Sequence, residues 1–545
     1  MECQARHHRE VYRATFPGGP LTWVLLPLVL SGCGLGEWAR NGGKVGPNYQ
    51  VPPTEVAAHW IDYQDARLSS QGQDLSRWWG VFGDPVLDGL IEEAYRQNLS
   101  LRAAGERIME SRARRGIAVG NIFPQNQQAA GSWTANKAST EAANAGLEQY
   151  FHNWEAGFNV SWELDLWGRF RRAIEAADAD LDASVANFDD VLVVLLADVT
   201  ANYVQYRTFQ VRIEVARRNV GIQEKSYQLA LDKFNAGAST ERDYQQAKQV
   251  LEQTRALIPQ LEAGARQAAN ALCVLLGTPP RDLTDRLGDA AGIPSPPPEL
   301  ALGIPADLLR RRPDVRRIER QAAAQSALIG VAKSDLYPRF SLLGSIGVRA
   351  EDFSNLFDTP GSVSGFVGPS FQWDILNYGR IEGNVHVQEA RFRQLVLGYQ
   401  EAVLRAGREA EDAAITYLKA QERARYLDGS VAAATRTVEI TYDQFQQGAI
   451  DFTPVFLFEG TLADQEDELA IAEGQIALSL VDLYRALGGG WEMRLHDGTT
   501  SRPAGPAATR PATTLPAHTP RLAPATGPAG TTRPADTTGP GATTR

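Results

Sequence analysis

The sequence predicts a mixed α and β fold in which each chain holds two tandem copies of a strand pair followed by a long helical hairpin. Three observations predict it. The chain contains an internal duplication, each copy carries long runs of apolar residues spaced seven apart, and each copy carries short segments of alternating apolar and polar residues. Steps of seven place side chains on one helix face, whereas alternation places them on one face of a strand.

The first 32 residues have the organisation of a secretory leader. Arginines precede a short apolar run at 21–30, and small residues follow it. This order is typical of a signal peptide. Leu30-Ser31-Gly32-Cys33 resembles the bacterial lipobox, which implies that Cys33 is acylated and begins the mature chain. A plain signal peptide with an incidental cysteine is the alternative. Gly34, where an aspartate would favour the inner membrane, favours the outer membrane.

The duplication covers residues 85–277 and 300–491, after a lipid-anchored N-terminal segment at 33–84. Matched motifs lie 214 or 211 residues apart: Gly116-Ile117-Ala118 with Gly330-Val331-Ala332, Phe123-Pro124 with Tyr337-Pro338, Trp162 with Trp373, Trp167-Gly168-Arg169 with Tyr378-Gly379-Arg380, Phe234 with Phe445, and Leu276-Gly277 with Leu487-Gly488. A period this long indicates a duplicated domain, since solenoid repeats are about 20–50 residues long. The proline-rich residues 278–299 are predicted to be an exposed linker.

Strand pairs are predicted just before the long helices, at about 125–136 and 153–164 and again at about 339–349 and 362–374. The apolar positions of the clearest segments are Trp154, Ala156, Phe158, Val160, Trp162 and Leu164, then Phe340, Leu342, Gly344, Ile346 and Val348. A membrane strand needs about 9–11 residues with one apolar face. Four strands alone would leave unpaired backbone groups in lipid, at several kcal/mol each. Membrane-spanning strands would therefore need a barrel shared between chains, and the alternative is a small soluble sheet.

Long helices are predicted at about 168–234 and 240–276 in the first copy and at about 380–446 and 452–487 in the second. The heptad positions are Val185, Leu192, Val199, Tyr206, Ile213, Val220, Tyr227 and Phe234, then Val396, Val403, Ala410, Tyr417, Ala424, Val431, Val438 and Phe445. Asn202 interrupts a parallel stripe, so it either fixes the register of a buried seam or lies where water reaches.

Each pair of helices is predicted to form an antiparallel hairpin. Gly237 and Gly448 lie in the short turns between the helices, and glycine can adopt the left-handed conformation that ends a helix. Ser239, Thr240 or Asp451 can then cap the returning helix. On the heptads alone, a coiled-coil stalk is the simplest interpretation.

Composition argues against several classes of function. The net charge of −11 disfavours nucleic acid as a partner, because no basic stripe dominates. Cys3, Cys33 and Cys273 show no metal-ligand spacing, and Cys273 lies in an apolar helical context typical of a core residue. No catalytic motif, phosphate-binding loop or zinc motif occurs. We therefore expect no enzyme activity, no cofactor and no metal.

Together these features resemble the TolC-like outer-membrane factors, in particular their lipoprotein group of the NodT and multidrug type. The resemblance covers the chain from Cys33 to about Trp491. It rests on the duplication and on the following motifs: Val45-Gly46-Pro47-Asn48-Tyr49, Pro52-Pro53, Trp78-Trp79 with Phe82, Asp84-Pro85 and Leu87, Leu308 to Val315, Ile329-Gly330, Tyr337-Pro338, and Trp373-Asp374 to Gly379-Arg380.

The resemblance implies a homotrimer with a 12-stranded barrel in the outer membrane and a 12-helix cylinder through the periplasm. It also implies an efflux channel that conducts passively, with energy supplied by an inner-membrane pump through a periplasmic adaptor. Two alternatives remain open. One is a channel for protein secretion of type I, and the other is a lipid-anchored coiled-coil spacer without a pore.

The resemblance also places a gate and the adaptor contact at the helical tips, at Gly237, Thr240, Asp243, Gly448 and Asp451. Asp451 best matches the family's constricting carboxylate, and a ring of such carboxylates would favour cations. A helix N-cap is the alternative for Asp451, and a solvated helix charge is the alternative for Asp243.

Two further features lie after the second helical tip. Leu457 stands where the family often has a carboxylate, so the resemblance does not carry over at that position. Residues 492–545 are rich in Pro, Thr, Ala and Gly and are predicted to be a disordered periplasmic tail.

Overall fold

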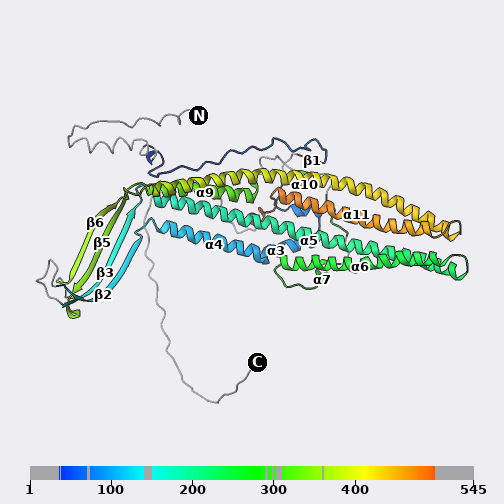
Figure 1. Ribbon diagram of the computed structural model, residues 1–545, viewed down its shortest axis with the longest axis horizontal. Helices are drawn as coiled ribbons and strands as arrows, with labels where there is room; N and C mark the ends of the chain where they lie inside the picture. Colours follow the sequence, from blue (N-terminus) through cyan, green and yellow to red (C-terminus); the bar gives the residue numbers. More distant parts are fainter. Residues whose placement is uncertain are drawn as a thin grey trace, which may run out of the picture. The chain divides into compact units, whose positions relative to one another are not determined.

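The computed structural model describes residues 36, 38–69, 74–139, 150–288, 292–296, 300–301, 310–358 and 361–496 (Figure 1). Its elements in chain order are β1 (Leu68–Ser69), η1 (Trp78–Phe82), α3 (Pro85–Gln97), α4 (Leu99–Gly120), β2 (Asn126–Lys137), β3 (Tyr150–Leu164), α5 (Arg169–Asn235), α6 (Glu241–Leu275), α7 (Thr284–Leu287), β4 (Leu300–Ala301), α9 (Pro313–Ser334), β5 (Arg339–Ala350), η2 (Phe353–Asn355), β6 (Val363–Gln372), α10 (Arg380–Gln446), α11 (Thr453–Ala486) and α12 (Met493–His496). The signal peptide and Cys33 lie outside the described residues.

The predicted fold class is confirmed: each copy contributes two strands and then a hairpin of long helices. The four strands form one antiparallel sheet in the order β2-β3-β5-β6, so the sheet joins the two copies through β3 and β5. A separate two-residue parallel pairing joins β1 to β4. No described helix combines the length and the apolar content that crossing a membrane requires.

The long helices leave the sheet and turn back at their far tips (Figure 1). Helices α5 and α10 are each 67 residues long, and a helix of that length extends about 100 Å. Their partners α6 and α11 are about half as long. The shorter α9 packs against both α5 and α10, while α4 packs against α5.

The main core lies where the short helices meet the hairpins. Trp78 of η1 stacks on Tyr484 of α11 with ring centroids 5.1 Å apart. Cys273 is fully buried in this cluster, as its apolar context predicts. Asn202 is half-buried, and its Nδ2 donates to the carbonyl of Asp198 on its own helix at 2.8 Å. The side chain of Asn202 therefore makes its bond within α5, which matches the interpretation of a seam edge better than that of a register lock.

The N-terminal segment caps the junction between β3 and α5 and then runs beside α10 of the second copy, where Ile61 bonds to Glu411 and Arg67 to the carbonyl of Leu418 (Figure 1). The N–H of Val45 donates to the carbonyl of Trp167 at 3.0 Å, and Arg172 donates to the carbonyl of Gly46 at 2.8 Å. Gly46 has φ +86, and a Cβ there would lie 2.5 Å from the Cα of Gly330 on α9. The glycine of the Val45-Gly46-Pro47-Asn48-Tyr49 motif is thus required by a close backbone approach.

Two predictions for the segments that follow the repeats are wrong, one about exposure and one about a boundary. The linker at 278–299 is not exposed throughout, because Leu283 and Leu287 are buried in the main core. The tail predicted at 492–545 begins too early, because Met493 is also buried there and Arg494 pairs with the buried Asp189. These apolar residues are isolated among polar ones and show neither helical nor strand periodicity. Neither contact could therefore be predicted from the sequence pattern. Residues 497–545 lie outside the described part of the chain.

Candidate functional site

The four-stranded sheet has two unlike faces. Directly paired residues share a face, so the register gathers the apolar positions of all four strands on one side. That side carries Gln127, Ala129, Gly131 and Trp133 of β2, then Trp154, Ala156, Phe158, Val160, Trp162 and Leu164 of β3, then Phe340, Leu342, Gly344, Ile346 and Val348 of β5, and Val363, Gly365, Val367, Pro369 and Phe371 of β6. Several of its large side chains, such as Ile346 and Val367, are exposed.

The opposite face of the sheet is mainly polar. Arg349 of β5 donates to Glu155 of β3 at 3.0 Å across this face. Its other polar members are Asn126, Gln128, Ser132, Thr134, Asn136, Asn153, Asn159, Ser161, Glu163, Arg339, Ser341, Ser345, Ser364, Ser370 and Gln372. Phe151, Leu343 and Phe366 are the large apolar side chains that also lie there. An apolar face opposite a polar one is the alternation expected of strands between lipid and water.

Aromatic rings lie at both ends of the apolar face. At the end away from the helices, Trp154 packs 5.9 Å from Trp133 and 5.0 Å from Phe353 of η2, centroid to centroid. At the helix end, Phe340 and Phe371 lie 6.3 Å apart. Aromatic residues favour the two interfaces of a bilayer, so the rings mark the limits of an apolar band.

Both edges of the sheet are open within the described chain. Strands β2 and β6 each bond to a neighbour on one side only. Three antiparallel pairings separate them, so β2 and β6 run in opposite directions. An exposed edge is a row of unpaired backbone groups that another strand can pair with.

The tips of the two hairpins share one backbone turn. Gly237 has φ +73 and Gly448 has φ +76, both left-handed. The N–H of Gly237 donates to the carbonyl of Phe234 at 2.9 Å, and that of Gly448 donates to Phe445 at 3.0 Å. Both glycines therefore end their helices in the left-handed conformation, as the sequence predicts.

The first tip buries its carboxylate. Thr240 is the N-cap of α6, and its backbone N–H donates to the carboxylate of Asp243 at 3.0 Å, as in a capping box. Asp243 is only 4% exposed. The interpretation of Asp243 as a solvated helix charge is therefore wrong, because its carboxylate is used to bind the backbone at the helix start.

The second tip leaves its carboxylate outside. The side chain of Asp451 is 54% exposed, and the N-cap of α11 is the buried Phe452 instead. The N-cap interpretation of Asp451 is therefore wrong, because Asp451 lies one residue too early. Arg242 joins the tips, donating to Asp243 at 3.3 Å and to Asp451 at 3.2 Å.

Apolar side chains fasten the two tips together behind these polar groups. The rings of Phe445 and Phe452 of the second tip pack 5.2 Å apart in a buried cluster that also holds Ala230 and Ala247 of the first hairpin. Lys233 of α5 donates to the carbonyl of Phe445 at the end of α10. Leu457 and the neighbouring Phe458 are exposed on α11.

A buried carboxylic acid lies on the seam between the hairpins, and no sequence motif predicted it. Ser226 of α5 hydrogen-bonds to Glu459 of α11, and both residues are almost fully buried. Burial raises the pKa of Glu459 to about 7, and the bond from Ser226 only partly offsets this. Gln223, one turn away on α5, is also buried, and neither polar atom of its amide has a hydrogen-bond partner within the described chain.

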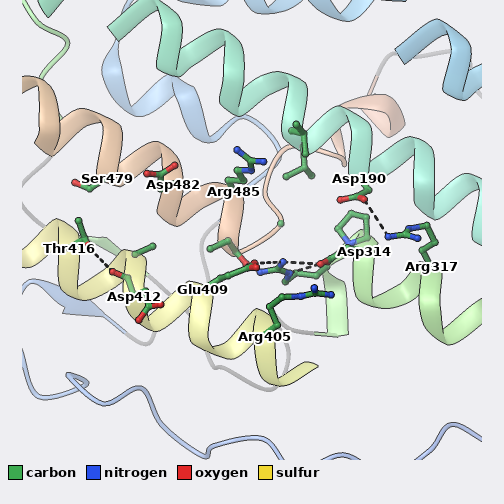
Figure 2. Close-up of a pocket in the computed structure, with 17 residues that line it drawn as sticks. Asp190, Asp314, Arg317, Arg405, Glu409, Asp412, Thr416, Ser479, Asp482 and Arg485 are labelled. Atoms are coloured by element: carbon green, nitrogen blue, oxygen red, sulfur yellow. Dashed lines mark hydrogen bonds and ion pairs between the residues drawn. The ribbon is translucent and has the colours of Figure 1, made fainter. Parts of the chain in front are cut away.

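A charged hollow of about 630 Å³ lies where α5, α9, α10 and α11 meet (Figure 2). Arg312 donates to Glu409 at 2.7 Å, to Asp314 at 2.9 Å and to the carbonyl of Ala486 at 2.6 Å. Burial raises the pKa of Asp314, but Arg312 outweighs burial and the net pKa is lowered. These bonds tie the start of α9 to α10 and to the end of α11. The Arg-Pro-Asp motif is therefore a structural clamp rather than a ligand site.

Comparison with known proteins gives one consistent result. A family model described as "Outer membrane efflux protein" matches residues 90–278 and 304–489. The chain is 30% identical to Nodulation protein T of Rhizobium leguminosarum bv. trifolii, over 86% of this chain and 97% of that protein. It is also 30% identical to Outer membrane protein OprJ of Pseudomonas aeruginosa, over 87% of this chain and 97% of that protein.

Solved structures agree with these matches. The outer-membrane channel OprN is 33% identical and superposes with a TM-score of 0.77, over 82% of this chain and 99% of that chain. The solved CusC chain is 26% identical and superposes with a TM-score of 0.70, over 82% of this chain and 100% of that chain.

Proposed function

The chain belongs to the outer membrane efflux protein family, and from this premise we propose that it is the outer-membrane channel of a tripartite efflux system. It conducts substrates passively from a periplasmic adaptor and an inner-membrane pump to the exterior, and it has no catalytic role. The observation that carries this proposal is the sheet, which combines one apolar face, one polar face and two open edges.

Closure of the sheet supports a shared pore. Because β2 and β6 run in opposite directions, β6 of one copy can pair antiparallel with β2 of the next. Closing the ring removes both open edges, which lipid would otherwise penalise by several kcal/mol per unpaired group. Three copies, the number that the family resemblance implies, give a barrel of twelve strands with the polar face toward the lumen and the apolar face toward lipid.

The predicted lipid anchor at Cys33 fits an orientation in which the helices lie on the periplasmic side of the membrane. Trp38 donates from its Nε1 to the carbonyl of Leu166, at the helix end of β3. The five residues of chain from Cys33 to Trp38 can reach at most about 18 Å. An acyl group on Cys33 would then enter the leaflet that meets the helix end of the sheet, which is the periplasmic leaflet of the outer membrane.

The tips at Gly237, Thr240, Asp243, Gly448 and Asp451 form the periplasmic entrance and the adaptor contact in this proposal. Asp451 is the carboxylate with an exposed side chain, so it is the one available to a ring of three. Such a ring would attract cations and repel anions at the constriction.

A small-molecule cargo is the substrate class we favour. Two relatives are named for such exports: Cation efflux system protein CusC of Escherichia coli, 26% identical over 83% of this chain and 97% of that protein, and Pyoverdine export outer membrane protein OpmQ of Pseudomonas putida, 28% identical over 81% of this chain and 94% of that protein. Deletion of the gene should raise sensitivity to drugs or metals and leave protein export intact. The reverse result would favour a secretion channel.

Conductance in a planar bilayer tests the channel itself. The purified protein should show discrete channels, and a coiled-coil spacer would show none. Asp451→Ala should raise the conductance because it shortens the side chain at the constriction and removes the bridge from Arg242 that joins the two tips. Asp443→Ala, which removes an exposed carboxylate earlier on α10, is the matched control and should leave the conductance unchanged. An unchanged value for Asp451→Ala would remove Asp451 from the gate.

A further inference from the structure

Two strands of the sheet run past the other two at the end away from the helices. The last residues that join β3 to β5 are Trp154 and Ala350, whereas β2 and β3 stay paired for four more residues, to Lys137 with Tyr150. At about 3.3 Å per residue, these four residues extend the ribbon by about 13 Å. We call residues 134–137 and 150–153 the ribbon end, and no third strand of the described chain pairs with it.

The length of the apolar face places the ribbon end at the level of the lipid headgroups. Leu164, at the helix end of β3, and Trp154 lie ten positions apart, which is about 33 Å along the strand. Strands of membrane barrels tilt by about 35–45°, so this stretch crosses about 25 Å, the height of an apolar band. The four residues beyond Trp154 therefore lie just outside the hydrocarbon, among the headgroups of the outer leaflet.

The charged side chains of the sheet are divided between its two faces. Glu155 and Glu163 lie on the polar face, where Arg349 donates to Glu155 at 3.0 Å. On the apolar face the described strands carry no Asp, Glu or Arg, and the basic side chains there are Lys137 and His152 of the ribbon end. Lys137 is exposed and forms no ion pair with another residue of the described chain. The apolar face thus has a cation without a counter-ion at its outer end.

Aromatic rings lie beside both basic side chains. Nζ of Lys137 is 5.4 Å from the centre of the Tyr150 ring, and the ring of His152 stacks on Trp133 with centroids 5.7 Å apart. Lys137 pairs directly with Tyr150, so His152 is its diagonal neighbour on the same face, at about 7–8 Å. At that spacing one phosphate group can accept from the ammonium of Lys137 and from a ring N–H of His152.

We propose that the ribbon end binds a phosphate group of an anionic lipid in the outer leaflet. Lys137 and His152 donate to the phosphate oxygens, while the rings of Tyr150 and Trp133 lie against the glycerol or sugar unit that carries the phosphate. The proposal rests on the proposed function, which places this end of the sheet at the outer surface of the membrane. It adds a ligand that conduction through the channel does not itself require.

The position of the site selects a lipid over a dissolved phosphate. Both basic side chains lie on the face that the proposed barrel turns toward lipid, where the headgroups of an anionic membrane surface attract a cation. Tyr150 is 64% exposed and Trp133 is 54% exposed, and such rings favour the interface between hydrocarbon and water. Because the described strands carry no basic side chain at the helix end of this face, the site belongs to the outer leaflet alone.

Native mass spectrometry of the full chain tests the site. The protein is inserted into phosphatidylcholine nanodiscs that contain dioleoylphosphatidate as the probe, and the phosphatidate that stays bound after release is counted. The wild type should retain phosphatidate in preference to phosphatidylcholine. Lys137→Ala should lower the retained amount about fivefold, the usual effect of one cation at an anionic surface, and Lys137→Arg should keep it. His152→Phe keeps a ring that can stack on Trp133 and should give a smaller loss, because it removes one donor.

Arg349→Ala is the matched control, because it removes a cation near the same end of the sheet but from the polar face. This variant should retain as much phosphatidate as the wild type, and an excess of inorganic phosphate should not displace the lipid. Equal retention by the wild type and Lys137→Ala, an equal loss in Arg349→Ala, or displacement by inorganic phosphate would each overturn the lipid site and leave the proposed channel standing. A chain that does not insert into the bilayer would overturn both.

Discussion

The two helical tips share one backbone turn, but the carboxylate of the first tip is buried and that of the second tip is exposed. Gly237 and Gly448 end α5 and α10 with left-handed residues in matching turns. At the first tip Asp243 turns inward and binds the start of α6, whereas at the second tip Asp451 points outward and the buried Phe452 is the N-cap of α11. The two copies therefore share the left-handed glycine that ends the first helix of the hairpin. They differ in the residues that begin the second helix. The first tip is stabilised by the bond between Thr240 and Asp243, whereas the second tip exposes the carboxylate of Asp451 at the surface.

The largest expected effect concerns Glu459, on the seam that holds the second tip against α5. An acid whose pKa is raised to about 7 in the folded state, from 4.5, binds a proton more tightly when folded. Its contribution to stability is fully present below pH 4.5 and is lost as the pH rises through 7. Glu459→Gln keeps a hydrogen-bonding partner for Ser226 and removes the titration. It should stabilise the hairpin contact at pH 8 by roughly 3 kcal/mol.

Thermal unfolding of the helices in detergent, followed from pH 5 to 8, measures this effect. The wild-type melting temperature should fall as the pH rises, and the Glu459→Gln curve should be flatter. Glu466→Gln is a control from the same face of α11, because Glu466 already has a cationic partner in Arg218. A wild-type curve without a fall between pH 5 and 8 would mean that Glu459 is charged throughout.

Next in size is the difference between the two tip carboxylates. Asp243→Ala removes the bond to the Thr240 N–H and should cost about 1–2 kcal/mol. Asp451→Ala removes an exposed side chain and should change stability by less than about 0.5 kcal/mol. Chemical denaturation of both variants, read by helical circular dichroism, gives the two values. Equal losses would break the comparison, since they would mean that the second tip depends on its carboxylate as well.

Substitution of Gly237 and of Gly448 should lower stability by the same amount. Gly237→Ala and Gly448→Ala should each cost about 1 kcal/mol, because a Cβ disfavours the left-handed conformation. A Cβ at either position would meet nothing within 4 Å, so no steric clash adds to this cost. Denaturation of both variants under one set of conditions checks the equality. Gly460→Ala, within α11 and in open space, is a control that should be neutral or stabilising. A loss at one tip only would show that the matching turns are not equivalent.

Much of this architecture could be predicted because its signals are local. The alternation of Trp154 to Leu164 decides which face of β3 is apolar, and the glycine turns decide where the long helices end. The inward turn of Asp243 also had a local signal, since Thr240-x-x-Asp243 follows the spacing of a capping box with aspartate in place of glutamate.

Other parts of the site could not be predicted because they depend on residues far apart in the chain. Glu459 follows an apolar run and gives no hint of being buried, and its partner Ser226 lies 233 residues earlier. Arg242 likewise reaches Asp451 across 209 residues. Such contacts follow from how one hairpin lies on the other, which no pattern within either hairpin specifies.

The smallest expected effect comes from Arg242, the cation that bridges the tips. Its side chain is 59% exposed, so its ion pairs with Asp243 and Asp451 are largely screened by water. Arg242→Ala should lower stability by about 0.5 kcal/mol or less, and high salt should abolish the difference from wild type. The same variant should increase cation selectivity in bilayer recordings, because Asp451 then loses its partner. Arg242→Lys keeps the charge and should retain wild-type selectivity. If Arg242→Ala cost as much as Asp243→Ala, the cap of the first tip would depend on Arg242, and the two tips would form one unit rather than a fixed tip beside an open one.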